Sequence, residues 1–275
     1  MLLGLQDLHQ AGVIHGDINP RNIVIDSEEN VRLIGFGRNL KLEVQTGENY
    51  TSDIKAAGRL VYYILSGGKH PFEVMGDMKN DVQDIEAQDL IDWMMKNNPT
   101  IDKILKHPYF WNEKRKEEVL IKVGDQPEIQ CCTDISQACK IWKAEKGLTG
   151  IEAIEKAFID KKGRNAQNRK TKILGILGET EQVKNENFSK IFLKLCNQAE
   201  SYSKDKTFSK WKTELSDKWS DIDPTYPEDL LGLLRTYRNK LTHVGFDKQM
   251  FNHYADFYIS LHRLAIDMSW DCTWS

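Results

Sequence analysis

Three residues in the stretch "RNKLTH", namely Arg238, Asn239 and His243, could together act on a phosphodiester. On an α-helix Asn239 and His243 lie one turn apart on the same face, and Arg238 lies about 100° round the axis from Asn239. A guanidinium grips phosphate oxygens with a two-pronged fork, and an imidazole can donate or accept a proton near neutral pH. These are the parts needed for transesterification of RNA, in which the 2′-OH attacks the adjacent phosphate and no metal ion is required.

A helix over residues 228–243 is predicted to hold these side chains. Its sequence, "DLLGLLRTYRNKLTH", carries apolar residues at helical spacing, and Gly245 just beyond is a suitable stop. His243 then lies in the last turn, where the helix dipole favours a protonated imidazole that can act as a general acid. An isolated Arg-Asn-x-x-x-His string is also common on ordinary surface helices, so its interpretation depends on the rest of the chain.

The composition sets limits on the kind of protein this is. The chain has 275 residues, 40% hydrophobic and 29% charged, with a net charge of −3, so an RNA-binding surface must be a local patch. No apolar run approaches the ~20 residues that span a bilayer, and the opening "MLLGLQDLHQ" lacks the basic start of a signal peptide. Five cysteines form no C-x-x-C pair, which favours reduced thiols over disulfides or a metal site. We expect a cytoplasmic chain without membrane contact.

The composition and the predicted secondary structure of the chain change after Trp111, where we place a domain boundary. Residues 1–111 mix helices with two β-rich pieces, "NIVID" and "VRLIGF", whereas residues 112–275 are charged and helical. In the second part we predict helices around 112–122, 135–146, 150–160, 187–200, 207–219, 228–243 and 247–268. The basic stretch "KKGRNAQNRKTK" is predicted to be an exposed loop, either simply solvated, an RNA clamp or a nuclear signal.

Residues 1–111 resemble the C-lobe of a protein kinase. "VIHGDINPRNIVI" followed by "VRLIGFG" is similar to the catalytic loop and magnesium motif of that family. "TSDIKAAGRLVYYILSGGKHPF" is similar to its central C-lobe helix and "PTIDKILKHPYFW" to its last one. The resemblance places Asp17 at the catalytic base and Asn22 at a metal-binding position. His15 and Asp17 can equally be retained because they hold the loop's hydrogen bonds.

The kinase pattern is incomplete in this sequence. Asn19 stands in place of the phosphate-steadying lysine, Gly35 in place of the magnesium-binding aspartate, and Gly16 in place of an arginine. The segment before "TSDI" is too short for an activation loop, and Asn98 replaces the arginine that would pair with its glutamate. By this resemblance the sequence begins inside the lobe, either because the protein lacks an N-lobe or because the chain is a piece of a longer one. We therefore expect a pseudokinase lobe that binds neither ATP nor ADP.

The continuation "HPYFWNEKRKEEVLIKVGDQPE" resembles the kinase-extension nuclease (KEN) family, which comprises ribonuclease L and the kinase/endoribonuclease of the unfolded-protein response. "TFSKWKTEL" and "DLLGLLRTYRNKLTH" match its nuclease helices. The resemblance implies a mainly α fold, in which a protein-kinase-like C-lobe precedes an all-α KEN ribonuclease domain. The region about 125–205 is longer than in the family.

The resemblance also implies a function, which is metal-independent cleavage of single-stranded RNA by a dimer. In it His243 is the general acid, Arg238 and Asn239 hold the phosphate, and Tyr226 lies near the 2′-OH. Trp211 either stacks on an RNA base or belongs to the core. No cofactor is implied for RNA cleavage.

Two features depart from the family pattern and keep alternatives open. Gly232 stands where an aspartate is expected, with Asp229 the nearest candidate, and Tyr226 is one residue closer to Arg238 than in the family. A catalytically inactive scaffold that binds an active relative is the first alternative. A serine/threonine kinase fragment is the second.

Overall fold

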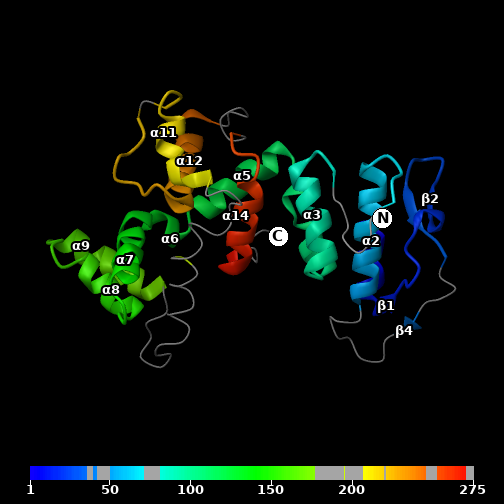
Figure 1. The fold of residues 1–275 in the computed structure, drawn as a ribbon, viewed down its shortest axis with the longest axis horizontal. Helices are drawn as coiled ribbons and strands as arrows, with labels where there is room; N and C mark the ends of the chain where they lie inside the picture. The colour runs from blue at the N-terminus through cyan, green and yellow to red at the C-terminus, as the bar shows by residue number, and fades with distance from the viewer. Residues whose placement is uncertain are drawn as a thin grey trace. The chain divides into compact units, whose positions relative to one another are not determined.

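The computed structural model describes residues 1–35, 40–41, 50–70, 81–176, 195, 207–219, 221–245 and 253–270. The chain forms two compact units, Met1–Trp111 and Asn112–Ser275, which we call unit 1 and unit 2. The division falls at Trp111, the residue after which the composition of the sequence changes. Both units consist mainly of helices (Figure 1), so the mainly α fold is confirmed.

Unit 1 contains four α-helices, two short 3-10 helices and two small antiparallel ladders among its described residues. Its elements are α1 (Leu2–Gln10), β1 (Val13–Ile14), η1 (Pro20–Asn22), β2 (Ile23–Ile25), β3 (Val31–Leu33), β4 (Leu40–Lys41), α2 (Thr51–Leu65), α3 (Ile85–Lys96), α4 (Ile101–Leu105) and η4 (Pro108–Phe110). In the ladders Val13 pairs with Lys41 and Ile23 with Leu33. The predicted strand pair is thus present, and the helix predicted near the end of the lobe is split into α4 and η4.

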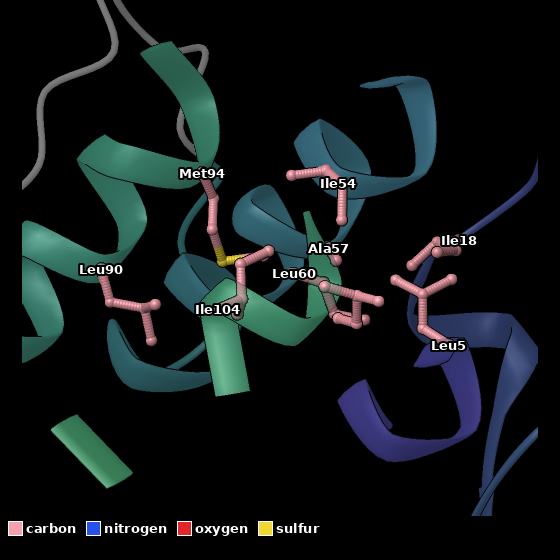
Figure 2. Packing of buried hydrophobic residues seen from close by; sticks show 9 residues of the cluster. Leu5, Ile18, Ile54, Ala57, Leu60, Leu90, Met94 and Ile104 are labelled. Atoms are coloured by element: carbon pink, nitrogen blue, oxygen red, sulfur yellow. The ribbon is translucent and has the colours of Figure 1, made fainter. Parts of the chain in front are cut away.

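The core of unit 1 joins its helices side by side (Figure 2). Leu5 comes from α1, Ile54 and Leu60 from α2, and Met94 from α3, and each is almost completely buried. Apolar residues three or four positions apart on α2 and α3 form the stripe that turns inward. Ile18 also belongs to this core, so the core holds the loop 15–22, which runs from β1 to β2.

Unit 2 is helical throughout its described part. Its elements are α5 (Glu113–Gly124), α6 (Pro127–Gln130), α7 (Cys132–Ala144), α8 (Gly150–Ala157), α9 (Arg164–Ile176), η5 (Thr207–Lys210), α11 (Trp211–Leu215), α12 (Leu230–Val244) and α14 (Phe257–Asp267). Side-chain caps begin several of them: Asn112 accepts from the backbone N–H of Arg115 at 2.8 Å, and Thr149 and Glu152 form a capping box. Helix α12 packs against α5.

From Arg164 onward, the basic stretch predicted as a loop is instead the start of helix α9, and residues 161–163 precede the helix. Ala166 and Ile173, two turns apart, are buried, and α7, α8 and α9 pack together (Figure 1). Arg169 and Lys161 both bind the buried carboxylate of Asp134, with N–O distances of 3.0 and 2.8 Å. The loop prediction is wrong because acids distant in sequence neutralise this charge run.

Other predictions differ in detail. The helix predicted over 187–200 lies outside the described residues, as does the first part of the one predicted over 247–268, in which α14 begins at Phe257. Cys131 and Cys132 are buried free thiols, as predicted, whereas Cys139 is disulfide-bonded. Reduced thiols are therefore wrong for Cys139, because a disulfide depends on distance in the fold rather than on spacing in sequence. Among the described helices, none has the length and apolar character needed to cross a bilayer.

Candidate functional site

Helix α12 carries three of the predicted site residues and is fixed at both ends. The Asp229 side chain accepts a hydrogen bond from the backbone N–H of Gly232 at 3.0 Å, which caps the first turn. Along one face Leu233, Tyr237 and other apolar residues are fully buried. The helix ends at Val244, and Gly245 follows with φ +91°. The predicted helix and its glycine stop are thus confirmed, and His243 lies in the last turn.

Tyr226 and Asn239 meet at the site. The Asn239 Nδ2 donates to the Tyr226 hydroxyl at 2.9 Å, and both side chains are half-buried. Tyr226 lies in the loop that leads into α12, so its shifted spacing does not remove it from the helix face that carries Asn239. The hydroxyl keeps its own proton free to donate to a further acceptor.

Arg238 is directed along α12 and toward α5 rather than toward Tyr226. Its Nε donates to Asp125 Oδ1 at 2.7 Å, and its Nη1 lies 3.3 Å from Thr242 Oγ1. Thr242 is one turn further along, so this face of α12 is about 100° from the face that carries Asn239 and His243. Sequence reasoning did not find Asp125, which is 113 residues away from Arg238.

His243 is exposed at the end of α12, beside a second unpredicted carboxylate, Asp221. The hydrogen bond from Lys240 lowers the pKa of Asp221, and the positive charge of protonated His243 acts in the same direction. Among the residues that the structure describes, no hydrogen bond holds the imidazole ring. The ring is therefore accessible to a ligand and lies close to the Asp221 carboxylate.

Trp211 belongs to the core. Its ring is fully buried and its Nε1 donates to the carbonyl of Pro227 at 3.1 Å. A base can stack only on an exposed ring face, so this conformation favours the core role over the RNA-stacking role. The indole instead holds the loop between α11 and α12.

Packing explains the departure at Gly232. A Cβ at this position would lie 2.0 Å from the carbonyl oxygen of Pro227, so an aspartate does not fit. Asp229 supplies the acidic side chain nearby, but as the cap of α12, and burial raises the pKa of its carboxyl. The two residues together close the start of the helix.

In unit 1 the kinase-like residues bind one another. Asp17 accepts hydrogen bonds on its carboxylate from Asn19 Nδ2 and Asn22 Nδ2, both at 3.0 Å. His15 is fully buried, with its Nε2 3.0 Å from the carbonyl oxygen of Ile34. A Cβ on Gly35 would lie 2.5 Å from the side chain of Asn22. These contacts agree with a structural role for His15, Asp17 and Asn22.

A cavity of about 300 Å³ in unit 1 lies apart from these residues. Tyr50, Asn98 and Asp102 are among the residues that line it, and Asn98 has a left-handed backbone with φ +47°. Asn98 stands in place of the arginine that forms an ion pair with a glutamate in kinases. The cavity therefore lies where that arginine would be. Elsewhere in the described part of the chain, no group of three or more His, Cys, Asp or Glu side chains is placed to hold a metal ion.

Known proteins with related sequences are ribonucleases and kinases. No protein-family model matches the chain. The 2-5A-dependent ribonuclease of Mus musculus is 31% identical over 144 residues, which are 48% of this chain and 20% of the relative. That of Homo sapiens is 27% identical over 215 residues, 70% of this chain and 29% of the relative.

A plant relative joins the two activities in its name. The serine/threonine-protein kinase/endoribonuclease IRE1a of Arabidopsis thaliana is 23% identical over 211 residues, 60% of this chain and 25% of the relative. This chain thus spans less than a third of each of these three relatives. The resemblance to the kinase-extension nuclease family is confirmed, and the chain is a homologue of the 2-5A-dependent ribonucleases and of the kinase/endoribonucleases.

Proposed function

We propose that the chain is a KEN-type endoribonuclease that cleaves single-stranded RNA without a metal ion or other cofactor. The observation that carries the proposal is the 2.9 Å hydrogen bond between Asn239 and Tyr226. It gathers a hydroxyl and an amide on the helix that also presents Arg238 and His243, in a chain whose relatives are named as ribonucleases.

Each side chain has a role in the transesterification. The 2′-oxygen forms a bond to phosphorus and passes its proton to a solvent water molecule, with the Tyr226 hydroxyl beside it. Arg238 and Asn239 donate hydrogen bonds to the phosphate oxygens, on which charge develops in the transition state. His243 donates its proton to the 5′-oxygen as the P–O5′ bond breaks. The products are a 2′,3′-cyclic phosphate and a free 5′-OH.

Unit 1 acts in the proposal as a degenerate kinase lobe. It supports dimerisation with a second copy of the chain, which completes the nuclease, and it transfers no phosphate. Asp17 is held by two amides, and Gly35 provides no side chain for magnesium. The partners are therefore an RNA substrate and a second copy, in the cytoplasm, with no role for ATP or ADP.

The test is an RNase assay in EDTA with the full 275-residue chain at rising concentration. We expect cleavage of single-stranded RNA with 2′,3′-cyclic phosphate ends, and a loss of about 10³-fold in His243→Ala. His253→Ala, which removes another exposed histidine of unit 2, serves as the control and should keep full activity. Cleavage that His243→Ala leaves unchanged would sink the assignment.

A non-catalytic scaffold is the second candidate. It is favoured by the ion pair that already occupies Arg238 and by the burial of Trp211. In this case the chain binds an active relative and does not cut RNA itself. Silence in the RNase assay at concentrations that produce dimers, together with tight binding to an active homologue, would identify the scaffold.

A further inference from the structure

The side chain of Arg238 packs against the C-terminal end of helix α5. Helix α5 ends at Gly124, Asp125 follows as its C-cap, and the helix packs against α12. Two neighbouring residues of α5 therefore meet one residue of α12. Neither Gly124 nor Asp125 belongs to the residues that the sequence motifs singled out.

Gly124 sets the direction of the Arg238 side chain. A Cβ on Gly124 would lie 2.3 Å from Cβ and 2.4 Å from Cγ of Arg238, which is far inside van der Waals contact. The first part of the arginine side chain thus lies directly on the glycine backbone. Because any larger residue would displace it, the packing of α5 and α12 fixes where this side chain starts.

Asp125 then orients the guanidinium of Arg238 by binding one of the five N–H donors of that group. The carboxylate takes the Nε–H at 2.7 Å, and Nη1 lies 3.3 Å from Thr242 Oγ1. A carboxylate that neutralised the group fully would take two parallel N–H bonds in a fork. Here Nη2 and one N–H of Nη1 have no hydrogen-bond partner among the described residues, so they can bind a phosphate.

The ion pair is too exposed to serve mainly in folding. The side chains of Arg238 and Asp125 are 28% and 42% exposed. Exposed pairs of this kind contribute little to stability, because water screens the two charges. Loss of the Asp125 carboxylate should therefore leave the fold intact and change only the orientation of Arg238.

We propose that Asp125 is a positioning residue of the nuclease, which holds Arg238 by Nε and turns its terminal nitrogens toward the scissile phosphate. The inference rests on the proposed ribonuclease function. A guanidinium that is preset in this way need not be ordered when charge develops on the phosphate, so its loss should affect the chemical step more than binding.

The test compares Asp125→Ala with Asp125→Asn in the full chain, on a single-stranded RNA oligonucleotide in EDTA. We expect Asp125→Ala to lower kcat about tenfold with little change in KM. Asp125→Asn keeps an acceptor oxygen in place and should retain activity within about threefold. Glu155→Ala is the matched control, because it removes an exposed carboxylate that pairs with Lys170 in the same unit, and it should change nothing.

The double variant decides whether Asp125 acts through Arg238. In an Arg238→Ala background, Asp125→Ala should have no further effect on kcat. Three outcomes would each overturn the inference and leave the proposed function standing. They are a loss in that background as large as in the wild-type background, unchanged activity in Asp125→Ala, and increased activity in Asp125→Ala, which would mean that Asp125 restrains Arg238. If Asp125→Ala does not fold, Asp125→Glu, which moves the carboxylate by one methylene, should show the same loss in kcat. A wild-type chain that does not cleave RNA overturns the proposed function and this inference with it.

Discussion

The loop 15–22 of unit 1 and the end of α12 in unit 2 carry similar polar side chains in opposite states. In the loop, both oxygens of the Asp17 carboxylate accept amide hydrogen bonds from Asn19 and Asn22. At the end of α12, by contrast, His243 is exposed, and Arg238 keeps donors that the described residues do not use. The polar groups described for the loop are used up by one another, whereas those at the end of α12 keep donors that can bind a ligand.

Two asparagines test this comparison with the largest expected effect. Asn239 and Asn22 each donate a side-chain amide to a neighbour, Tyr226 and Asp17 respectively. Asn239→Ala removes a phosphate donor of the proposed nuclease and should lower cleavage about 10²-fold or more. Asn22→Ala should keep cleavage within about threefold but destabilise unit 1 by about 1–2 kcal/mol, because Asp17 loses a hydrogen bond. RNase rates and unfolding curves measure the two effects. The same change in rate and in stability in both variants would contradict the difference between the two regions.

Two glycines outside these regions extend the comparison to the two units, because each unit has a glycine where the resemblance predicts an aspartate. Gly232→Ala should destabilise unit 2 by about 2–4 kcal/mol, since its Cβ would meet the backbone carbonyl of Pro227 at 2.0 Å and a backbone cannot easily yield. Gly175→Ala is the matched control in α9, where a Cβ meets nothing within 4 Å. That variant should gain about 0.5–1 kcal/mol. Denaturant unfolding measures both, and a stable Gly232→Ala would contradict the packing.

Gly35→Asp should have a smaller cost of about 1–2 kcal/mol. The residue has φ +89°, which disfavours any side chain, but the neighbour that a Cβ would meet is the Asn22 side chain, which can turn away. We also expect no gain of magnesium-dependent ATP binding, because Asn19 and the two amides on Asp17 remain. Calorimetric titration with Mg-ATP checks this. Tight binding by Gly35→Asp would show that the loop is one residue from a nucleotide site.

The sequence was sufficient for most of the helices and for the residues on α12. The sequence identified α2 and α12, because each buries one apolar stripe against its own unit. It failed at α9, where the buried apolar residues among those described are Ala166 and Ile173, and where the stabilising acid, Asp134, comes from a different helix. Local periodicity does not contain such partners.

The site shows the same limit. Arg238, Asn239 and His243 were predictable because one helix turn relates them. Asp125 was not, because it lies 113 residues from Arg238 and reaches it only through the packing of α5 on α12. Trp211 was predicted with two roles, and only its burial in the fold separates them.

The smallest expected effect concerns how the stability of each unit depends on pH, through one buried carboxylate in each. Burial alone would raise the pKa of Asp53 in unit 1, but hydrogen bonds from His9 and from the backbone of His15 and Gly16 outweigh it and hold that pKa below its usual value. Burial raises the pKa of Glu128 in unit 2, where one carboxylate oxygen has no partner among the described residues. The stabilisation by Asp53 is therefore lost as pH falls, whereas Glu128 costs stability as pH rises.

Glu128→Gln should remove that cost. The folded state of the wild type binds the Glu128 proton more tightly than the unfolded state does, so its stability falls as pH rises from the unfolded pKa through the higher folded one. The variant, which mimics the protonated acid, should match the wild type near pH 4 and be more stable by about 1 kcal/mol at pH 8. Unfolding midpoints across that range measure the difference. A variant that is less stable than the wild type at pH 8 would mean that the ionised carboxylate has a partner, and that unit 2 satisfies its buried acids as fully as unit 1 does.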